Sequence, residues 1–425
     1  MNIKFSYVLV VVITLVLFSS CFTAAPTKTE KKTTSSMYNP FMYRLHPEYT
    51  VYCQSENKSL LYTKIYLSEL LFSPMGPKKK HRGKIKIEYK IFHPDNLEQM
   101  IDSASAEFTI RKQKGQNNII SYIKLKDQSV KKYYLQITTT DMLRRVKVQN
   151  YIYVDREENS SRQNFIISSK KNKQPYFKNF FRPDHFFSIK YNKSVDSIYI
   201  KYYLKEIPLP YPPFASLKRD KINTVVDSLW SVSGKTAFQF HEKKKGFYFI
   251  QTDTTSSYGL GLVNPGEHFP YIKTPDAMVE PLRYLSSTDE YNDLIISTNK
   301  KLAVDRFWLD CGKKSSRARE LIRIYYNRTL YANIYFTSFT QGWRTDRGMI
   351  YLMFGPPKAV KKYPTKEIWQ YSDRMNYKVL QFVFNRVDNP YTDNDFVLER
   401  HIDFKKFWFR AVESWRGGTV YDIFQ

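Results

Sequence analysis

The sequence predicts a multidomain protein, with an all-β N-terminal part of one or two antiparallel sandwiches and a C-terminal α+β domain. Three observations lead to this prediction. Apolar and polar residues alternate with a period of two over much of the first two thirds, which is the pattern of half-buried strands. Apolar residues recur three or four positions apart in the final third, as on amphipathic helices. A length of 425 residues allows two or three domains, each able to close its own core.

The chain begins with a segment typical of a signal peptide. Lys4 supplies a positive charge, and Tyr7–Phe18 is apolar apart from Thr14. As a helix this apolar segment would extend ~18 Å, which is less than the ~30 Å of a bilayer's hydrocarbon core. The length therefore favours an export signal over a membrane span, and we expect residues 1–20 to be a signal peptide.

The segment ends in Phe18-Ser19-Ser20-Cys21, which resembles the lipoprotein box of bacteria, in which the cysteine is acylated. The usual box has Leu, Val or Ile where this sequence has Phe18. The alternatives are lipidation at Cys21 and ordinary cleavage nearby that leaves a soluble protein, and we predict lipidation. Residues 21–36 are rich in Thr, Ser and Lys, so we expect a lipid-anchored linker that makes the membrane a partner.

Cysteine usage and charge narrow the function classes further. Cys53 and Cys311 fall in different predicted domains, so two buried single thiols are expected rather than a disulfide. The formal net charge is +27, but it is spread through the chain instead of being focused in one patch. Together with export, this spread argues against a nucleic-acid partner and favours a general attraction to anionic lipid headgroups or acidic glycans.

The first two thirds divide into two predicted β-rich domains. Residues 37–155 are expected to form a sandwich-like domain, because short alternating segments are separated by turn signals. A polar, then aromatic stretch with two prolines marks a boundary, and residues 156–275 form the second β-rich domain. Within it, Thr236–Phe240 and Gly246–Ile250 are predicted to pair as a hairpin, and Gly259–Val263 is its last strand.

Residues 276–425 are predicted to form the α+β domain. Helix starts are expected at Ser287 and Ser315, and a helix over Leu302–Leu309 is expected to stop at Gly312. The run Met349–Phe354 is apolar at every position and is predicted to be a strand covered on both faces.

The end of the chain is predicted to alternate between strands and a final helix. Strands are expected around Ile368–Tyr371, Val379–Phe384 and Asp395–Leu398. The last helix has Asp403 as its expected N-cap. Five of the six Trp lie in this final third, which marks it as a separate packed unit.

The stretch Gln341–Gly348 (QGWRTDRG), followed by an apolar run and Gly355-Pro356-Pro357, resembles the GWxTD domain family. Members occur mainly in exported proteins and lipoproteins of Bacteroidetes and some other bacteria. The resemblance covers about Ser286 to Tyr421. It implies an envelope location and a domain layout, but it brings no established enzymatic activity.

The motif can be read in two ways. Its residues are Gly342, Trp343, Thr345, Asp346, Arg347, Gly348, Gly355, Pro356 and Pro357. In the first interpretation they form a structural corner, in which Gly342 takes a positive φ, Gly348 lets the next strand begin close to its neighbour, and the fork of Arg347 binds Asp346 or Glu320. In the second, Trp343, Arg344 and Arg347 line a pocket for an anionic or sugar ligand.

Local catalytic and metal motifs are not found. The sequence has no HExxH, CxxC or GxSxG pattern, and its 7 His are scattered, so we predict no catalytic residue, metal or cofactor. We expect a non-enzymatic outer-membrane lipoprotein, facing the periplasm, that binds or scaffolds another envelope protein or a glycan. The alternative is a cell-wall or polysaccharide-acting hydrolase whose catalytic groups come from distant positions.

Overall fold

The structure is a computed structural model. It describes residues 37–40, 45–76, 80–126, 130–204, 207–217, 219, 225–372 and 379–421. The predicted signal peptide, the linker 21–36 and the lipidation site Cys21 lie outside the described residues. Within the described ranges, every helix is too short or too polar to cross a lipid bilayer.

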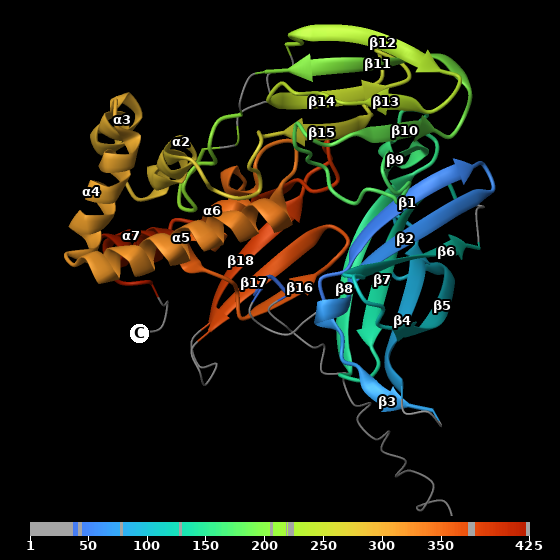
Figure 1. The fold of residues 1–425 in the computed structure, drawn as a ribbon, viewed down its shortest axis with the longest axis horizontal. Helices are drawn as coiled ribbons and strands as arrows, with labels where there is room; N and C mark the ends of the chain where they lie inside the picture. Colours follow the sequence, from blue (N-terminus) through green and yellow to red (C-terminus); the bar gives the residue numbers. More distant parts are fainter. Residues whose placement is uncertain are drawn as a thin grey trace, which may run out of the picture. The chain divides into compact units, whose positions relative to one another are not determined.

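Two antiparallel sheets form the first region (Figure 1), with strand orders β1-β2-β6 and β3-β4-β7-β8, and β5 is paired to β4. The first sheet contains β1 (Glu48–Ser55), β2 (Lys58–Tyr66) and β6 (Asn118–Leu125). The second contains β3 (Ser73–Met75), β4 (Lys80–Phe92), β5 (Met100–Arg111), β7 (Lys132–Asp141) and β8 (Val146–Asp155), and a 3-10 helix η1 (Leu67–Glu69) follows β2. Leu61 of the first sheet and Ile85 of the second share one hydrophobic cluster, so the pair is sandwich-like.

The second region also consists of two antiparallel sheets, with orders β13-β10-β9 and β12-β11-β14-β15. A 3-10 helix, η2 (Arg162–Asn164), precedes the first of their strands. The strands are β9 (Phe165–Ser169), β10 (Phe187–Tyr191), β11 (Val195–Tyr203), β12 (Ser228–Gly234), β13 (Phe238–Phe240), β14 (Gly246–Gln251) and β15 (Leu260–Asn264). Ile189 of one sheet and Ile250 of the other lie in one cluster.

The predicted hairpin of Thr236–Phe240 with Gly246–Ile250 is wrong. β13 pairs with β10, whereas β14 pairs with β11 and β15. Residues 241–245 therefore carry the chain from one sheet to the other. Both strands bury aromatic side chains in the cluster shared by the two sheets, and this common core, rather than sequence neighbourhood, decides their pairing.

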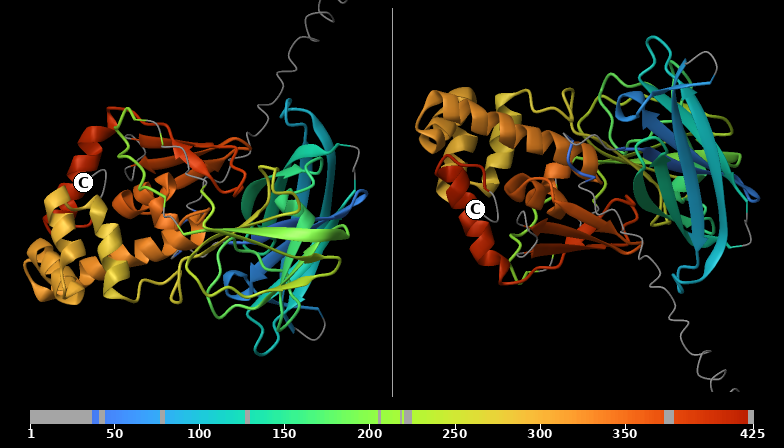
Figure 2. Two further views of the ribbon diagram at one scale, coloured as in Figure 1. Left: turned by 90° about the horizontal axis from the view of Figure 1, so that it is seen from above. Right: turned by 90° about the horizontal axis from the view of Figure 1, so that it is seen from below.

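The C-terminal region contains helices and a four-stranded antiparallel sheet of order β16-β17-β18-β19. Its helices are α2 (Pro275–Val279), η3 (Glu280–Tyr284), α3 (Thr288–Ile296), α4 (Lys300–Gly312), α5 (Ser315–Phe336), η4 (Gly342–Arg344), α6 (Asp346–Phe354) and α7 (Phe404–Arg416). Its strands are β16 (Ala359–Lys362), β17 (Lys366–Ser372), β18 (Val379–Arg386) and β19 (Phe396–Leu398). Figure 2 shows these orange and red elements gathered together. The predicted fold class, mostly β and then α+β, is confirmed.

Most predicted helix ends are close to the observed ones. Ser287 forms a capping box with Glu290 at the start of α3, and Asp403 precedes α7 but makes no side-chain capping bond. The expected stop at Gly312 is displaced by one residue, because Gly312 is the last helical residue and Lys313 takes the left-handed conformation. Gly312 instead provides room for α5, since a Cβ there would lie 2.7 Å from the backbone nitrogen of Ala318.

The run Met349–Phe354 is helical, so its prediction as a strand is wrong. It belongs to α6, which Thr345 caps by accepting a hydrogen bond from the Gly348 backbone N–H, and which ends at Gly355 with a φ of +80°. An uninterrupted apolar run fits a buried strand and a fully buried helix equally well. Here every residue of α6 is buried, so neither period two nor period 3.6 is visible in the sequence.

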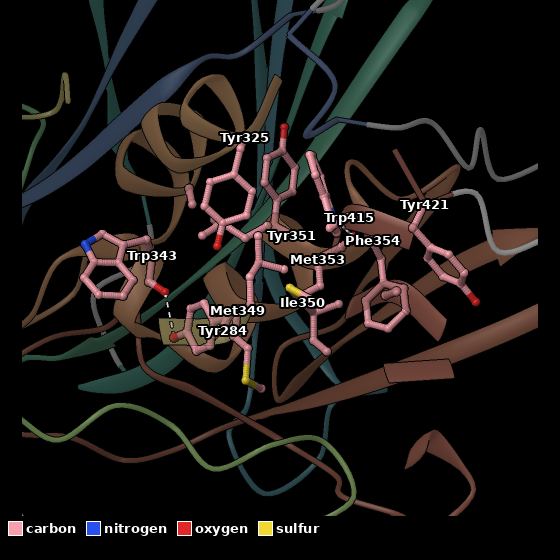
Figure 3. Packing of buried hydrophobic residues seen from close by; sticks show 14 of the residues in the cluster. Tyr284, Tyr325, Trp343, Met349, Ile350, Tyr351, Met353, Phe354, Trp415 and Tyr421 are labelled. Atoms are coloured by element: carbon pink, nitrogen blue, oxygen red, sulfur yellow. Dashed lines mark hydrogen bonds between the residues drawn. The ribbon is translucent and has the colours of Figure 1, made fainter. Parts of the chain in front are cut away.

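Helix α6 lies at the centre of the C-terminal hydrophobic cluster. Figure 3 shows Ile350 and Met353 of α6 in one packed group with Tyr325 of α5 and Trp415 of α7. The ring centroids of Tyr325 and Trp415 are 5.2 Å apart. The aromatic residues that mark the last third of the sequence thus form a single core around α6.

Both described cysteines are single buried thiols, as predicted. Cys53 belongs to the first cluster and Cys311 to the C-terminal one, and both are free. Burial raises the pKa of each thiol, so neither has the thiolate character of a nucleophile.

Candidate ligand-binding site

The motif forms the connection between helices α5 and α6, and backbone hydrogen bonds to side chains hold it. Thr337 accepts from the Gly342 N–H at 3.1 Å, and Asn333 accepts from the Trp343 N–H at 3.3 Å. Thr345 donates to the Gly342 carbonyl at 2.7 Å and accepts from the Gly348 N–H at 3.1 Å. These four bonds satisfy backbone groups of the turn locally, as a buried corner requires.

The two glycines of the motif serve close packing rather than an unusual backbone conformation. Gly342 does not have the positive φ that we expected. A Cβ on Gly342 would overlap the Ala332 carbonyl oxygen, and one on Gly348 would overlap the Gly342 carbonyl oxygen. Gly348 therefore lets helix α6, not a strand, pack backbone against backbone.

Trp343 is fully buried in the corner. It is 1% exposed, and its indole N–H donates to the Gln341 side chain at 3.0 Å. Its carbonyl accepts a hydrogen bond from the Tyr284 hydroxyl at 3.1 Å (Figure 3). Trp343 is thus a structural anchor, and it does not line either cavity described below.

The two charged residues of the motif bind different partners, which corrects the expected pairing of Arg347 with Asp346 or Glu320. Asp346 accepts the Leu398 N–H at 2.8 Å and forms an ion pair with Arg400. Arg347 instead pairs with Glu367 of β17 at 3.3 Å. Adjacent residues on a helix point about 100° apart, so one side chain faces β19 and the other faces β17.

Glu367 is the centre of a buried polar network. Its carboxylate accepts hydrogen bonds from the Tyr38 hydroxyl at 2.9 Å and the Trp369 indole at 3.0 Å, and the Lys362 ammonium lies 3.6 Å away. Burial would raise the pKa of Glu367, but Lys362 and Arg347 outweigh it and hold the pKa below its ordinary value. Glu367 is therefore an ionised acceptor at neutral pH.

The network contains more positive than negative groups. Burial lowers the pKa of Lys362, and repulsion from Arg347 and Arg386 adds to this effect against the attraction of Glu367. The Arg386 guanidinium donates to the Tyr151 carbonyl at 3.3 Å, and its Nε is buried without a partner among the described residues. The network is thus a cationic region beside a single buried carboxylate.

This network lines a cavity of about 710 Å³, which we call the main cavity. Its wall is formed by Tyr38 and by residues of β1, β8, β9, the end of α5, α6 and the sheet β16–β18. Side-chain amides and aromatic rings share the lining, including Asn150, Gln163, Tyr151 and Tyr335. Volume and mixed lining are those of a small-molecule site.

The other candidate residue, Arg344, lies at a second cavity of about 530 Å³. Arg344 lines it together with Gln341, Phe247 and Tyr391, and the Arg344 guanidinium donates to the Ile207 carbonyl at 2.9 Å. The predicted pocket of Trp343, Arg344 and Arg347 is therefore not assembled as one site, because the two arginines open into different cavities.

The remaining motif residues close the end of helix α6. Arg328 of α5 donates to the Leu352 and Met353 carbonyls at 2.9 and 3.1 Å. The Gly355 carbonyl accepts from the Tyr371 hydroxyl at 2.8 Å. Pro356 and Pro357 follow in the link to β16, where a proline cannot continue a helix.

Sequence reasoning missed Glu367, Lys362, Arg386 and Tyr38. One signal was present for Glu367: it shares the buried face of β17 with Trp369 and Tyr371, and a charged residue at an inward strand position requires a buried partner. The other three join the network only through contacts between segments far apart in the chain, which a single sequence does not reveal. No group of three or more His, Cys, Asp or Glu among the described residues is placed to hold a metal ion.

Comparison with known proteins agrees with the motif. The model of the GWxTD domain family matches residues 246–417, so this part of the chain carries a GWxTD domain. The match begins before the resemblance seen in the sequence and includes strands β14 and β15 of the second region.

The other comparisons add little. No curated protein matches the sequence. Among solved structures, the crystal structure of CBD12 from CALX1.2 is similar over 58% of this chain and 92% of its own, at 10% identity and a TM-score of 0.16. A likeness at this level supports no conclusion about fold or function.

Proposed function

We propose that this protein is a non-enzymatic lipoprotein of the bacterial outer membrane, facing the periplasm, that binds another envelope component. Cys21 would carry the lipid and residues 21–36 would form the tether. The GWxTD domain at residues 246–417 supports this proposal, because the family occurs mainly in exported proteins. The observation that carries the binding role is the main cavity, where residues of the β-rich regions and of the GWxTD domain share one wall.

The chemistry of that wall favours a glycan over an extended protein surface. Amide side chains recognise hydroxyl groups, and aromatic rings pack against the apolar faces of sugars. A volume of about 710 Å³ is within the usual range for small ligands, ~300–1,000 Å³. A protein partner would instead require a larger exposed surface.

Crosslinking in native membranes, followed by mass spectrometry, tests the binding role. We expect an envelope protein or a glycan-bearing molecule to be recovered with the wild-type chain. Cys21→Ser should change the electrophoretic mobility and release the protein from the membrane, since stable anchoring needs the acyl chains. Recovery of no partner, or unchanged mobility and membrane association of the Cys21→Ser variant, would contradict the proposal.

One observation favours a hydrolase as the second candidate function. Carboxylates line the main cavity, and the His46 ring lies 2.8 Å from Glu69. However, Lys178 and Lys64 overcome the effect of burial and lower the pKa of Glu48, and the pKa of Glu367 is also lowered. A general acid needs a raised pKa. Turnover of a polysaccharide or peptidoglycan panel, abolished by Glu69→Gln, would favour the hydrolase.

A further inference from the structure

The described lining of the main cavity contains one more cationic than anionic side chain. Its described lining contains five Lys or Arg and four Asp or Glu residues, and these are Arg162, Lys178, Arg347, Lys362, Arg386, Glu48, Glu69, Glu367 and Asp393. Glu48 pairs with Lys178 at 2.9 Å and Asp393 pairs with Arg162 at 3.2 Å. Glu69 pairs with His46, and Glu367 serves both Arg347 and Lys362. Arg386 is left without an ion pair among the described residues.

Two guanidinium groups in this cavity have unused donors. The Nε atoms of Arg347 and Arg386 are both buried without a hydrogen-bond partner in the described part of the chain. Arg347 is 2% exposed, so water does not substitute freely for the missing acceptor. An unsatisfied N–H on a buried charged group is costly, and native structures rarely keep one without a function.

The two arginines contact the same aromatic ring. The guanidinium carbon of Arg347 lies 4.1 Å from the ring centroid of Phe396, and that of Arg386 lies 5.2 Å from the same centroid. Lys362 and Arg347 share the Glu367 carboxylate, at 3.6 and 3.3 Å. Two arginines therefore share one aromatic ring, and two cations share one carboxylate, an arrangement suited to a second anion.

We propose that the main cavity binds an acidic sugar, with its carboxylate or phosphate group held by Arg386 and Arg347. This inference rests on the proposed function and specifies its ligand class. The oxyanion would lie beside Arg386 and balance its charge. The ring of Tyr151, which is also in the lining, would pack against the sugar body.

Isothermal titration calorimetry with the full-length protein in detergent tests this proposal. The probes are glucuronate, glucose 6-phosphate and glucose, with inorganic phosphate as a fourth. We expect glucuronate or glucose 6-phosphate to bind and glucose not to bind, and the stronger of the two identifies the anionic group. Affinity should fall with increasing salt, because part of the attraction is electrostatic.

Three variants locate the site. Arg386→Gln should weaken binding of the acidic sugar roughly tenfold or more. Arg386→Lys should lose less affinity, because lysine keeps the positive charge. Lys362→Gln should also weaken binding, which gives a second test if Arg386→Gln folds poorly. The matched control is Arg323→Gln, an exposed arginine on α5 outside both cavities, and it should bind as the wild type does.

The outcomes separate this inference from the proposed function. Equal binding of glucose and glucuronate would overturn the anion site and leave glycan binding intact. Binding that is unchanged in Arg386→Gln and Lys362→Gln would place the ligand elsewhere. A peptide bound through its C-terminal carboxylate in preference to both acidic sugars would overturn the sugar assignment. Absence of binding by every probe would refute the inference even if crosslinking recovers a partner.

Discussion

Replacing Glu367 by glutamine tests whether the buried network stabilises the GWxTD domain. The substitution keeps the size and one acceptor oxygen, but it removes the buried carboxylate beside Arg347 and Lys362, whose distances to it are 3.3 and 3.6 Å. The side chain of Glu367 is 4% exposed, so solvent cannot replace the lost charge. Removing one partner of a buried ion pair costs ~3–5 kcal/mol, and we expect the free energy of unfolding to fall by about this amount.

Urea unfolding followed by tryptophan fluorescence measures this effect directly. Five of the six Trp residues lie in the final third, and all five belong to the C-terminal cluster, so the signal reports on the domain that contains Glu367. The matched control is Glu413→Gln, an exposed residue of α7, which should change stability by less than ~0.5 kcal/mol.

A double variant tests the physical reason for the loss. Lys362→Gln combined with Glu367→Gln removes a cation together with the carboxylate, so less unbalanced charge remains. We expect the double variant to be more stable than the sum of the two single losses predicts, with a coupling of ~1–3 kcal/mol. A loss below ~1 kcal/mol for Glu367→Gln, or strict additivity in the double variant, would refute the view that charge balance holds this network together.

The remaining predictions concern the same region. Gly348→Ala should destabilise the protein by at least ~2 kcal/mol, because its Cβ would overlap the Gly342 carbonyl oxygen and overpacking forces the backbone apart; an unchanged urea midpoint would contradict this. Asp346→Asn should cost about 3 kcal/mol through its buried pair with Arg400, measured in the same assay. The pKa of Glu367 is lower in the folded state than in the unfolded chain, so its contribution is present at neutral pH and is lost as the pH falls through the folded pKa. Acid titration should therefore destabilise the wild type more than Glu367→Gln; parallel curves would contradict this.

The sequence predicted the architecture better than the connections within it. The alternation in β4 and β11 and the helical period in α5 are local patterns, and burial follows each of them. Helix α6 was missed because burial on all sides removes the period. The pairing of β13 with β10 was missed because strand pairing depends on a core assembled from several segments.

In the candidate site, too, local features were predictable from the sequence, whereas contacts between distant segments were not. Within the motif, Thr345 accepts the N–H of Gly348 in the corner itself, whereas Asp346 accepts the N–H of Leu398 in strand β19. Their partners were not predictable, because Arg400 and Glu367 lie 54 and 20 positions from the residues they bind. Only the inward position of Glu367 in an alternating strand gave a local signal.

Tyr38 connects the proposed tether to the proposed binding site. Its hydroxyl donates to Glu367, its carbonyl accepts from the Tyr351 hydroxyl at 2.7 Å, and its ring packs 4.9 Å from that of Phe336. The residue is 6% exposed and follows the predicted linker almost directly. Because the same side chain lines the main cavity and donates to Glu367, a ligand that draws on Arg347 or Lys362 would alter the contacts of Tyr38. Under the proposed function, ligand binding would thus be linked to the contacts of Tyr38, so that a change in either would affect the free energy of the other.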